Sequence, residues 1–246
     1  MPKLTLATTV PGEPEIFHSL QGEGVAAGRP SVFVRLSGCN LACHWCDTPY
    51  TWNFEGTPHA HRDVAKHDRT ANRLKHSVEE VAAAVRGFAC QHLVFTGGEP
   101  LLQQPALAAL CEALGEGFHI EVESNGTIPL IPAFDRHVDQ LNLSPKLSHS
   151  GNSEAERLKP ATLRAYARDP RAWFKFVVAD EADVDEVGAL AADHGIEADR
   201  ILLMPEGTSS AALVARTAWL APLCVARGYR LSDRLHIHLY GDTRGR

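Results

Sequence analysis

The chain has 246 residues, of which 44% are hydrophobic, enough to fill a core and to argue against wholesale disorder. Its formal net charge of −6 argues against a general nucleic-acid binder, which needs a basic face to displace counterions. No apolar run approaches the roughly 20 residues that span a bilayer, and the N-terminus lacks the apolar stretch of a secretory signal. We therefore expect a cytoplasmic protein without a nucleic-acid or membrane partner.

Apolar runs alternate with helical patterns along most of the chain. A first core strand is predicted over 31–36, and a helix begins at Ser77, where Glu80 completes a capping box. Further strands are predicted over 93–95, 120–122, 141–143, 174–178 and 201–204, and helices over 105–114 and near 160–168, 181–193 and 209–227. Because parallel neighbours need crossover connections, this alternation predicts an α/β fold with about six parallel strands in an open, partial barrel. A closed barrel of eight strands would be tight in this length.

One segment breaks this alternation. Residues 53–76 are rich in histidine, arginine and lysine and have almost no apolar periodicity. We expect a polar insertion there, and a solvated loop is favoured over a histidine metal site. No repeat or Ser/Gly linker divides the remainder, so one domain over residues 1–246 is expected.

Three of the six cysteines fall within eight residues, directly after the first predicted strand. The spacing of Cys39, Cys43 and Cys46 (CxxxCxxC) lets a short loop wrap three thiolates around one centre. Iron–sulfur clusters are held by thiolates, and three of them leave the fourth iron of a [4Fe–4S] cluster open. A structural zinc site would need a fourth ligand, and no second CxxC follows. The remaining three cysteines are interpreted as buried small hydrophobes.

Polar motifs also follow three later strands. These are Thr96-Gly97-Gly98-Glu99-Pro100, the stretch from Glu121 to Thr127, and Ser144-Pro145-Lys146. Active sites of β/α folds collect at the carboxyl ends of strands. The two glycines permit close backbone approach to a ligand, and Glu99 could accept a hydrogen bond from a ligand ammonium. A turn or a helix cap explains any one of these motifs alone.

The cysteine loop at the end of a first strand resembles that of radical S-adenosylmethionine (SAM) enzymes, and GGEP resembles their SAM-binding motif. The resemblance implies a [4Fe–4S] cluster whose open iron binds SAM. One electron then cleaves SAM to a 5′-deoxyadenosyl radical, which takes a hydrogen atom from the substrate. The positions matching SAM contacts in these enzymes are Trp45, Cys46, Asp47, Gly98, Glu99, Ser124, Ser144, Pro145 and Lys146.

Three further strings resemble the 7-carboxy-7-deazaguanine synthase family: EIFHSLQGEG at 15–24, FVRLSGC at 33–39 and DTPYTW at 47–52. The LQGEG piece discriminates best, because radical SAM chemistry in general does not require it. The resemblance implies a lyase that converts 6-carboxy-5,6,7,8-tetrahydropterin to 7-carboxy-7-deazaguanine with loss of ammonia, in 7-deazapurine and queuosine biosynthesis. It further implies a homodimer, an electron donor of flavodoxin type, and Mg²⁺ with Thr48 as ligand, although DTP is also an ordinary turn.

The matching substrate contacts are Leu20, Gln21, Gly22, Arg35 and Thr96. A guanidinium suits the carboxylate of a pterin acid, and Arg35 in an apolar strand is costly unless paired. A salt bridge within the fold is the alternative for this arginine. Two other functions stay open: a glycyl-radical enzyme activase, and a non-catalytic iron–sulfur protein or zinc-stabilised module. No role is assigned to the final apolar segment, 235–242.

Overall fold

The computed structural model describes residues 2–246. Ten strands form one sheet in the order β10-β9-β8-β7-β6-β5-β3-β1-β4, and β2 pairs with β3 outside that path. The strands are β1 (Lys3–Ala7), β2 (Ile16–Leu20), β3 (Pro30–Leu36), β4 (Arg73–Ser77), β5 (His92–Gly97), β6 (His119–Ser124), β7 (Gln140–Leu143), β8 (Ala172–Val178), β9 (Ile201–Pro205) and β10 (Arg230–Leu231).

The parallel part of the sheet runs from β3 to β10. The predicted strands are confirmed as β3, β5, β6, β7, β8 and β9, and each pairs in parallel with the next. The short β10 extends this series beside β9. The sheet path ends at β10 on one side and at β4 on the other, so the barrel is open. The predicted partial β/α barrel is therefore confirmed.

Three antiparallel strands were not predicted from the sequence. β2 pairs along β3 from Ile16 opposite Val34 to Leu20 opposite Pro30. β1 meets β3 at Leu36 and pairs over its whole length with β4. β4 takes up the end of the polar segment, so the expected loop covers only 53–72. Polar residues interrupt each of these strands, which leaves no continuous apolar run to reveal them, and β1 pairs with the distant β4.

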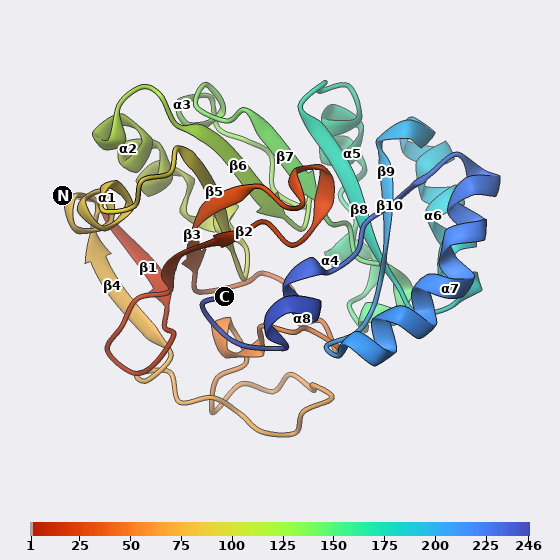
Figure 1. Cartoon of the computed structure of the whole chain (residues 1–246), viewed down its shortest axis with the longest axis horizontal. Coiled ribbons are helices and arrows are strands. Elements are labelled where there is room, and N and C mark those ends of the chain that lie inside the picture. Colours follow the sequence, from red (N-terminus) through yellow and green to blue (C-terminus); the bar gives the residue numbers. More distant parts are fainter. Residues whose placement is uncertain (1) are drawn as a thin grey trace.

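The helices follow the strands as the alternation predicts (Figure 1). They are α1 (Val78–Arg86), α2 (Gln104–Leu114), α3 (Pro132–Asp135), α4 (Glu154–Arg157), α5 (Pro160–Ala167), α6 (Glu181–His194), α7 (Ser210–Arg227) and α8 (Leu235–Tyr240). The predicted capping box is present: Glu80 N donates to Ser77 Oγ at 3.2 Å, and Ser77 N donates to Glu80 Oε2 at 2.7 Å. None of the helices in residues 2–246 is both long and apolar enough to span a bilayer.

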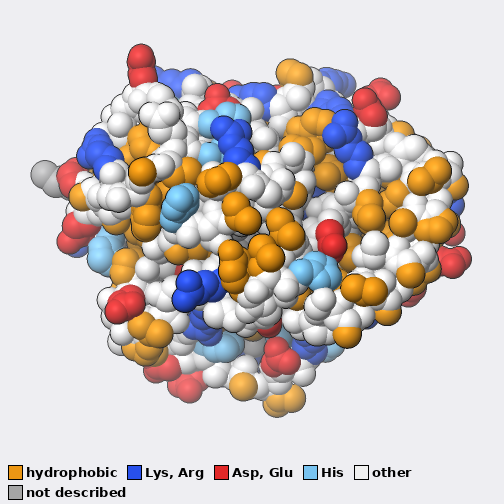
Figure 2. Space-filling model, in the orientation of Figure 1, with side chains coloured by type: hydrophobic (Ala, Val, Ile, Leu, Met, Phe, Trp, Pro, Cys, Tyr) orange, Lys and Arg blue, Asp and Glu red, His pale blue; other side chains and the backbone are white. Residues whose placement is uncertain are grey.

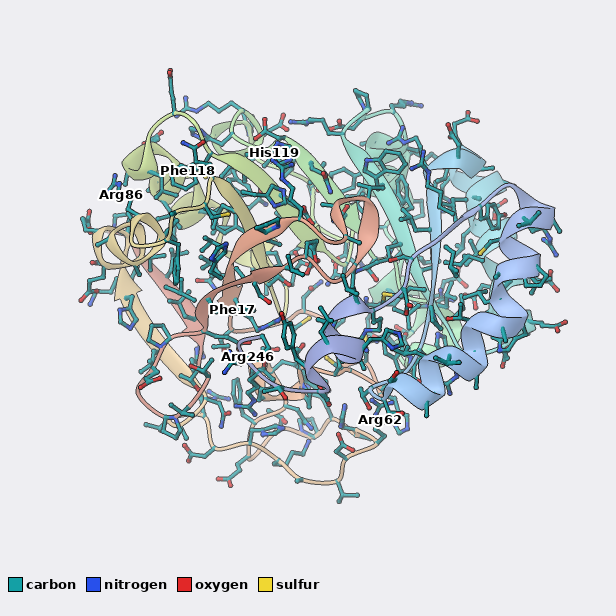
Figure 3. The ribbon with its side chains drawn as sticks, viewed as in Figure 1. Phe17, Arg62, Arg86, Phe118, His119 and Arg246 are labelled. Carbon is teal, nitrogen blue, oxygen red and sulfur yellow. The ribbon has the colours of Figure 1, made fainter. Side chains whose placement is uncertain are left out.

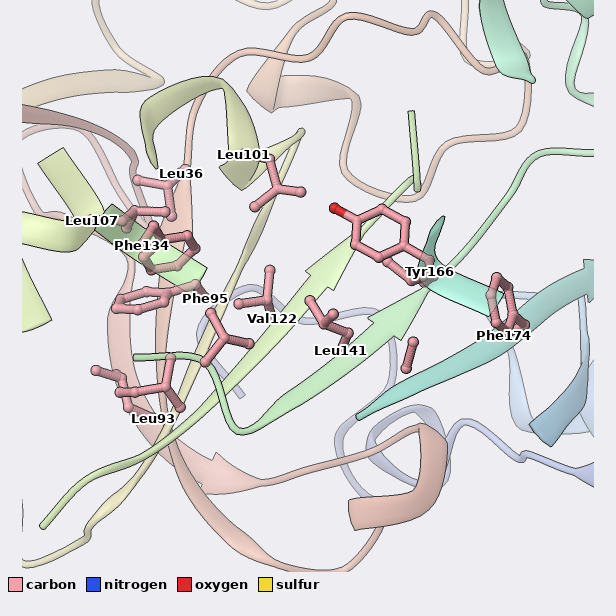
Figure 4. Packing of buried hydrophobic residues seen from close by; sticks show 14 of the residues in the cluster. Leu36, Leu93, Phe95, Leu101, Leu107, Val122, Phe134, Leu141, Tyr166 and Phe174 are labelled. Atoms are coloured by element: carbon pink, nitrogen blue, oxygen red, sulfur yellow. The ribbon is translucent and has the colours of Figure 1, made fainter. Parts of the chain in front are cut away.

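The core lies between the sheet and its helices. Leu36, Phe95, Val122, Leu141 and Phe174 come from successive parallel strands and are buried together (Figure 4). Burying each such side chain is worth about 1.5–3 kcal/mol. This packing fixes the strands side by side, so the residues that follow them are brought to one end of the sheet. In Figure 1, α8 and the chain end lie in front of the sheet, and the orange segment after the cysteine loop runs along the lower edge.

Candidate active site

A cavity of about 390 Å³ opens at the carboxyl ends of β3 and β5 to β9. Every motif contributes predicted residues to its wall. Of the predicted residues, only Glu99 and Pro145 do not line it. The predicted residues in the wall are Leu20, Gln21, Gly22, Arg35, Cys39, Cys43, Trp45, Cys46, Asp47, Thr48, Thr96, Gly98, Ser124, Ser144 and Lys146. Phe17 and Arg246 also line it, and both are labelled in the central part of Figure 3. The face seen in Figure 2 carries charges of both signs, with hydrophobic side chains gathered near its centre.

Each of the three predicted cluster ligands accepts a hydrogen bond from an N–H group. The bonds run from Leu41 N to Cys39 Sγ at 3.4 Å, from Asn152 Nδ2 to Cys43 Sγ at 3.3 Å, and from Trp52 Nε1 to Cys46 Sγ at 3.3 Å. Such donors compensate negative charge on sulfur and are typical of the thiolates that hold iron–sulfur clusters. The donor set of this loop therefore fits a cluster bound through all three sulfurs.

Burial raises the pKa of all three thiols, that of Cys43 to about 11. A thiol in such surroundings loses its proton when a metal compensates the charge, so metal binding releases protons. Within residues 2–246, no three His, Cys, Asp or Glu side chains converge closely enough to hold one metal ion. A four-iron cluster binds its thiolates on separate irons.

The two glycines of the TGGEP motif lie so close to the backbone of neighbouring residues that no side chain would fit. A Cβ at Gly97, whose φ is +137°, would lie 2.1 Å from Leu36 O, and one at Gly98 would lie 2.2 Å from Gly38 O. Only glycine allows backbones to approach this closely. The motif therefore seats the end of β5 against the entrance to the cysteine loop.

Glu99 lies behind the cavity wall and is fully buried. Its carboxylate accepts hydrogen bonds from Leu101 N at 2.9 Å, Ser124 Oγ at 2.9 Å and Asn125 N at 2.7 Å. Burial raises its pKa to about 6, against the pull of these donors. Glu99 thus holds the turn that follows β6, and a direct contact between Glu99 and SAM stays a prediction, as does one by Pro145.

Residues matched to SAM contacts meet around Trp45. The ring of His149 stacks on its indole, with centroids 5.2 Å apart and planes 22° from parallel. Lys146 Nζ lies 5.7 Å from the centroid of the same indole and donates to Ser144 Oγ at 2.8 Å. An aromatic surface beside a cation is suited to a planar base and a carboxylate.

The residues matched to substrate contacts gather around two carboxylates of β6. Gln21 Nε2 donates to Glu121 Oε1 at 2.6 Å and to Glu123 Oε1 at 3.2 Å, and Thr96 Oγ1 donates to Glu123 Oε2 at 2.7 Å. The sequence analysis placed Glu121 and Glu123 in a polar stretch at the end of a strand but gave neither a role toward the substrate. Their spacing of two along a strand, which puts both on one face, was the available signal.

Arg35 forms the salt bridge that was the alternative for this residue. Its Nε donates to Glu15 Oε1 at 2.8 Å, and Tyr50 Oη donates to Glu15 Oε2 at 3.0 Å. Burial would lower the pKa of Arg35, but Glu15 and Tyr50 raise it above its usual range. The side chain also lines the cavity, so the salt bridge orients a permanent cation there.

The sequence model of the radical SAM superfamily matches residues 33–211. A 7-carboxy-7-deazaguanine synthase of Pyrobaculum aerophilum is 40% identical over 239 residues, covering 94% of this chain and 96% of the relative. One of Halobacterium salinarum is 40% identical over 251 residues, covering 93% and 90%. The chain belongs to the 7-carboxy-7-deazaguanine synthase family.

Solved structures agree with this membership. QueE from Escherichia coli superposes with a TM-score of 0.66 at 27% identity, covering 95% of each chain. Streptococcus suis SuiB bound to S-adenosylmethionine has a TM-score of 0.50 at 11% identity, covering 79% of this chain and 48% of SuiB, and shows the fold alone. The predicted radical SAM enzyme is confirmed, and with it the [4Fe–4S] cluster and SAM that the family implies. Neither the activase nor the non-catalytic alternative finds support in these matches.

At Thr48, the family's expected magnesium ligand, the structure has a turn. Thr48 O accepts hydrogen bonds from Thr51 N at 3.0 Å and from Thr51 Oγ1 at 2.8 Å, and a 3₁₀ turn over Pro49–Thr51 follows. The hydroxyl lies 3.6 Å from Cys46 Sγ and lines the cavity. A turn and a ligand role are compatible at this residue, and magnesium stays a prediction.

A charged network that the sequence analysis missed lines the same cavity in this family member. Arg234 pairs with Asp47 and, at 3.0 Å, with Glu23, which also pairs with Lys175 and lies 3.8 Å from His236 Nε2. Burial alone would raise the pKa of Glu23, but Lys175 and Arg234 lower it well below its usual range. The pKa of Asp47 is likewise lowered, because Arg234 outweighs burial. We call these five residues the charged network.

Proposed function

We propose that the chain converts 6-carboxy-5,6,7,8-tetrahydropterin to 7-carboxy-7-deazaguanine with release of ammonia. Family membership supports this reaction. The observation that carries it is one cavity that joins the three cysteine thiols to a polar pocket of the right chemistry for a pterin acid, lined by Gln21, Glu123 and Arg35. A protein that activated another protein would have no use for that pocket.

In this proposal Cys39, Cys43 and Cys46 hold the cluster. When bound, the cluster and SAM supply the radical that takes a hydrogen atom from the substrate. The protein contributes position and exclusion of water. The Trp45 indole and Lys146 are suited to orient the base and the carboxylate of SAM, and Gly98 keeps the loop close enough for both.

The pterin would be held by its two polar ends. The amino group and the ring N–H of its pyrimidine edge would donate to the Glu123 carboxylate. The acceptor atoms of the same edge would receive hydrogen bonds from Gln21 and from the backbone of Leu20 and Gly22. Its carboxylate is suited to Arg35. Thr96 Oγ1 already bonds Glu123 at 2.7 Å and so fixes that carboxylate.

Mg²⁺, the reductant and the assembly are also proposed. Mg²⁺ keeps most of its waters and needs few protein ligands, so Thr48 and substrate oxygens would suffice. An electron donor of flavodoxin type would reduce the cluster. A homodimer is supported by the apolar outer side of α7, where Val214 is 62% exposed and Val225 is 84% exposed.

Anaerobic incubation of the reconstituted protein with SAM, Mg²⁺, dithionite and the carboxytetrahydropterin tests the reaction. The deazapurine should form, detected by mass spectrometry. Arg35→Ala should lose at least about a hundredfold in kcat/KM for the pterin, because a buried charge-assisted contact is worth about 3 kcal/mol. Its cleavage of SAM without substrate should persist. Competent SAM cleavage without product in the unmodified protein would contradict the proposal.

A further inference from the structure

The donors to the three thiols differ in origin. Leu41 donates from the backbone of the cysteine loop, so any residue there except proline would supply the same N–H. Trp52 and Asn152 donate from side chains outside the Cys39–Cys46 loop. Those two bonds exist because of the residue type at each position, and a substitution can remove them individually.

The Trp52 indole is held in place by the polar insertion. The rings of His59 and His61 stand edge-on to it, with centroids at 5.9 Å and 6.1 Å and interplanar angles of 71° and 72°. His61 Nδ1 accepts from Asp63 N at 3.0 Å, which leaves Nε2 as the donor to Cys46 O at 2.8 Å. The start of the insertion therefore binds both the backbone of a cluster ligand and the indole that donates to its sulfur.

The Asn152 amide is fixed in one orientation. Its Oδ1 accepts from Ala42 N at 2.9 Å, inside the cysteine loop. Its Nδ2 therefore faces Cys43 Sγ at 3.3 Å and also Ser150 Oγ at 3.3 Å. A flipped amide would set its NH₂ group against the Ala42 N–H, so the donor to sulfur cannot exchange places with the acceptor.

We propose that Trp52 and Asn152 raise the reduction potential of the cluster. The inference rests on the proposed function, in which the three cysteines hold [4Fe–4S]. Reduction adds one electron and no proton, so negative charge on the sulfurs increases. An N–H dipole directed at a sulfur stabilises that charge, and hydrogen bonds to sulfur are among the determinants of cluster potential. Both residues act as positioning residues with an electrostatic effect, and the insertion serves to keep the indole on Cys46.

The test is a potentiometric titration of the reconstituted protein, followed by electron paramagnetic resonance (EPR), without SAM or substrate. Trp52→Phe removes the N–H and keeps an aromatic ring between the two histidines. Asn152→Asp keeps the acceptor for Ala42 N and replaces the donor by a charged oxygen, so its fall includes the effect of that charge and should exceed the fall in Trp52→Phe. At the midpoint of the unmodified protein, the ratio of reduced to oxidised cluster should fall at least threefold in each variant, about 28 mV at 59 mV per tenfold change. Trp173→Phe is the control and should leave the ratio unchanged, because that indole packs under Arg230 at 4.5 Å.

Iron and sulfide analysis precedes the titration and separates the possible failures. An unmodified protein that binds no cluster contradicts the proposed function itself. A bound cluster with an unchanged ratio in Trp52→Phe and Asn152→Asp overturns this inference alone. Where neither variant retains the cluster, pulsed EPR of a Trp45→Phe protein labelled with ¹⁵N-indole decides. Coupling of the ¹⁵N to the reduced cluster is expected, and its absence overturns the bond from Trp52.

Discussion

The cysteine loop and the charged network line the same cavity but satisfy their polar groups in opposite ways. Burial raises the pKa of the thiols in the loop, and the protein offers them N–H donors but too little positive charge to ionise them. In the network, carboxylates and cations compensate each other, so the pKa of Glu23 falls despite burial. The loop is completed by a cofactor, whereas the network is complete once the chain has folded.

The two regions meet at neighbouring residues. Asp47 follows Cys46 directly, and Arg234 ties it to Glu23. Arg234 comes immediately before α8, so its guanidinium links the start of α8 to the residue that follows the cysteine loop. The comparison predicts that damage to the loop abolishes cofactor chemistry and that damage to the network costs folding stability.

The largest effect is expected in the loop. Replacing Cys39, Cys43 or Cys46 by Ala removes a cluster ligand, and SAM cleavage should fall by at least about a thousandfold, because the radical chemistry belongs to the cofactor. Iron content and 5′-deoxyadenosine formation are the measurements. Cys90→Ala is the control, since its thiol donates only to the backbone, at 3.3 Å to Pro30 O. Full cleavage activity in a loop variant would end its assignment as a ligand.

This contrast also explains what the sequence could reveal. The loop could be recognised because its three cysteines lie within eight residues, and their role as ligands stays a prediction. The parallel strands were predicted because each is a continuous apolar run. The network joins positions 23, 47, 175, 234 and 236, which only the folded sheet brings together. Lys175 carried a signal, because a lysine inside the apolar run 174–178 needs a buried partner. That partner is Glu23, which belongs to the EIFHSLQGEG string. In that string only Leu20, Gln21 and Gly22 had been given a role.

Breaking the network should affect stability next most strongly. Arg234→Met leaves Glu23 and Asp47 with less countercharge. Removing one partner of a fully buried ion pair costs about 3–5 kcal/mol, but the side chains of Glu23 and Asp47 are 14% and 37% exposed, so a loss of about 2–3 kcal/mol is expected. Urea unfolding of the cluster-loaded protein under argon measures it. Arg227→Met is the control: its 2.6 Å pair with Asp185 is exposed, and such pairs contribute about 0–1 kcal/mol. Equal losses in both variants would show that the network adds no stability.

The charged network also makes the folding stability depend on pH. Because the pKa values of Glu23 and Asp47 are lowered in the folded state, the stability they contribute is present above the ordinary carboxyl pKa and is lost as the pH falls below it.

The smallest effect is expected at Glu99, a buried carboxylate held by N–H and hydroxyl donors without an ion pair. Its pKa is raised by burial from 4.5 to about 6, so the folded state holds this proton more tightly than the unfolded state. Stability should therefore fall as the pH rises between these values, by about 2 kcal/mol in all. The measurement is the difference in unfolding free energy between the unmodified protein and Glu99→Gln at pH 4.5 and pH 7. Glu99→Gln lowers the unfolding free energy by an amount that does not depend on pH, because its amide NH₂ faces a donor. Only the change of the difference with pH therefore reports the titration of the Glu99 carboxyl. If the stability contributed by Glu99 rose with pH, the donors would outweigh burial. The pKa of Glu99 would then be lowered in the folded state, like those of Glu23 and Asp47 in the charged network.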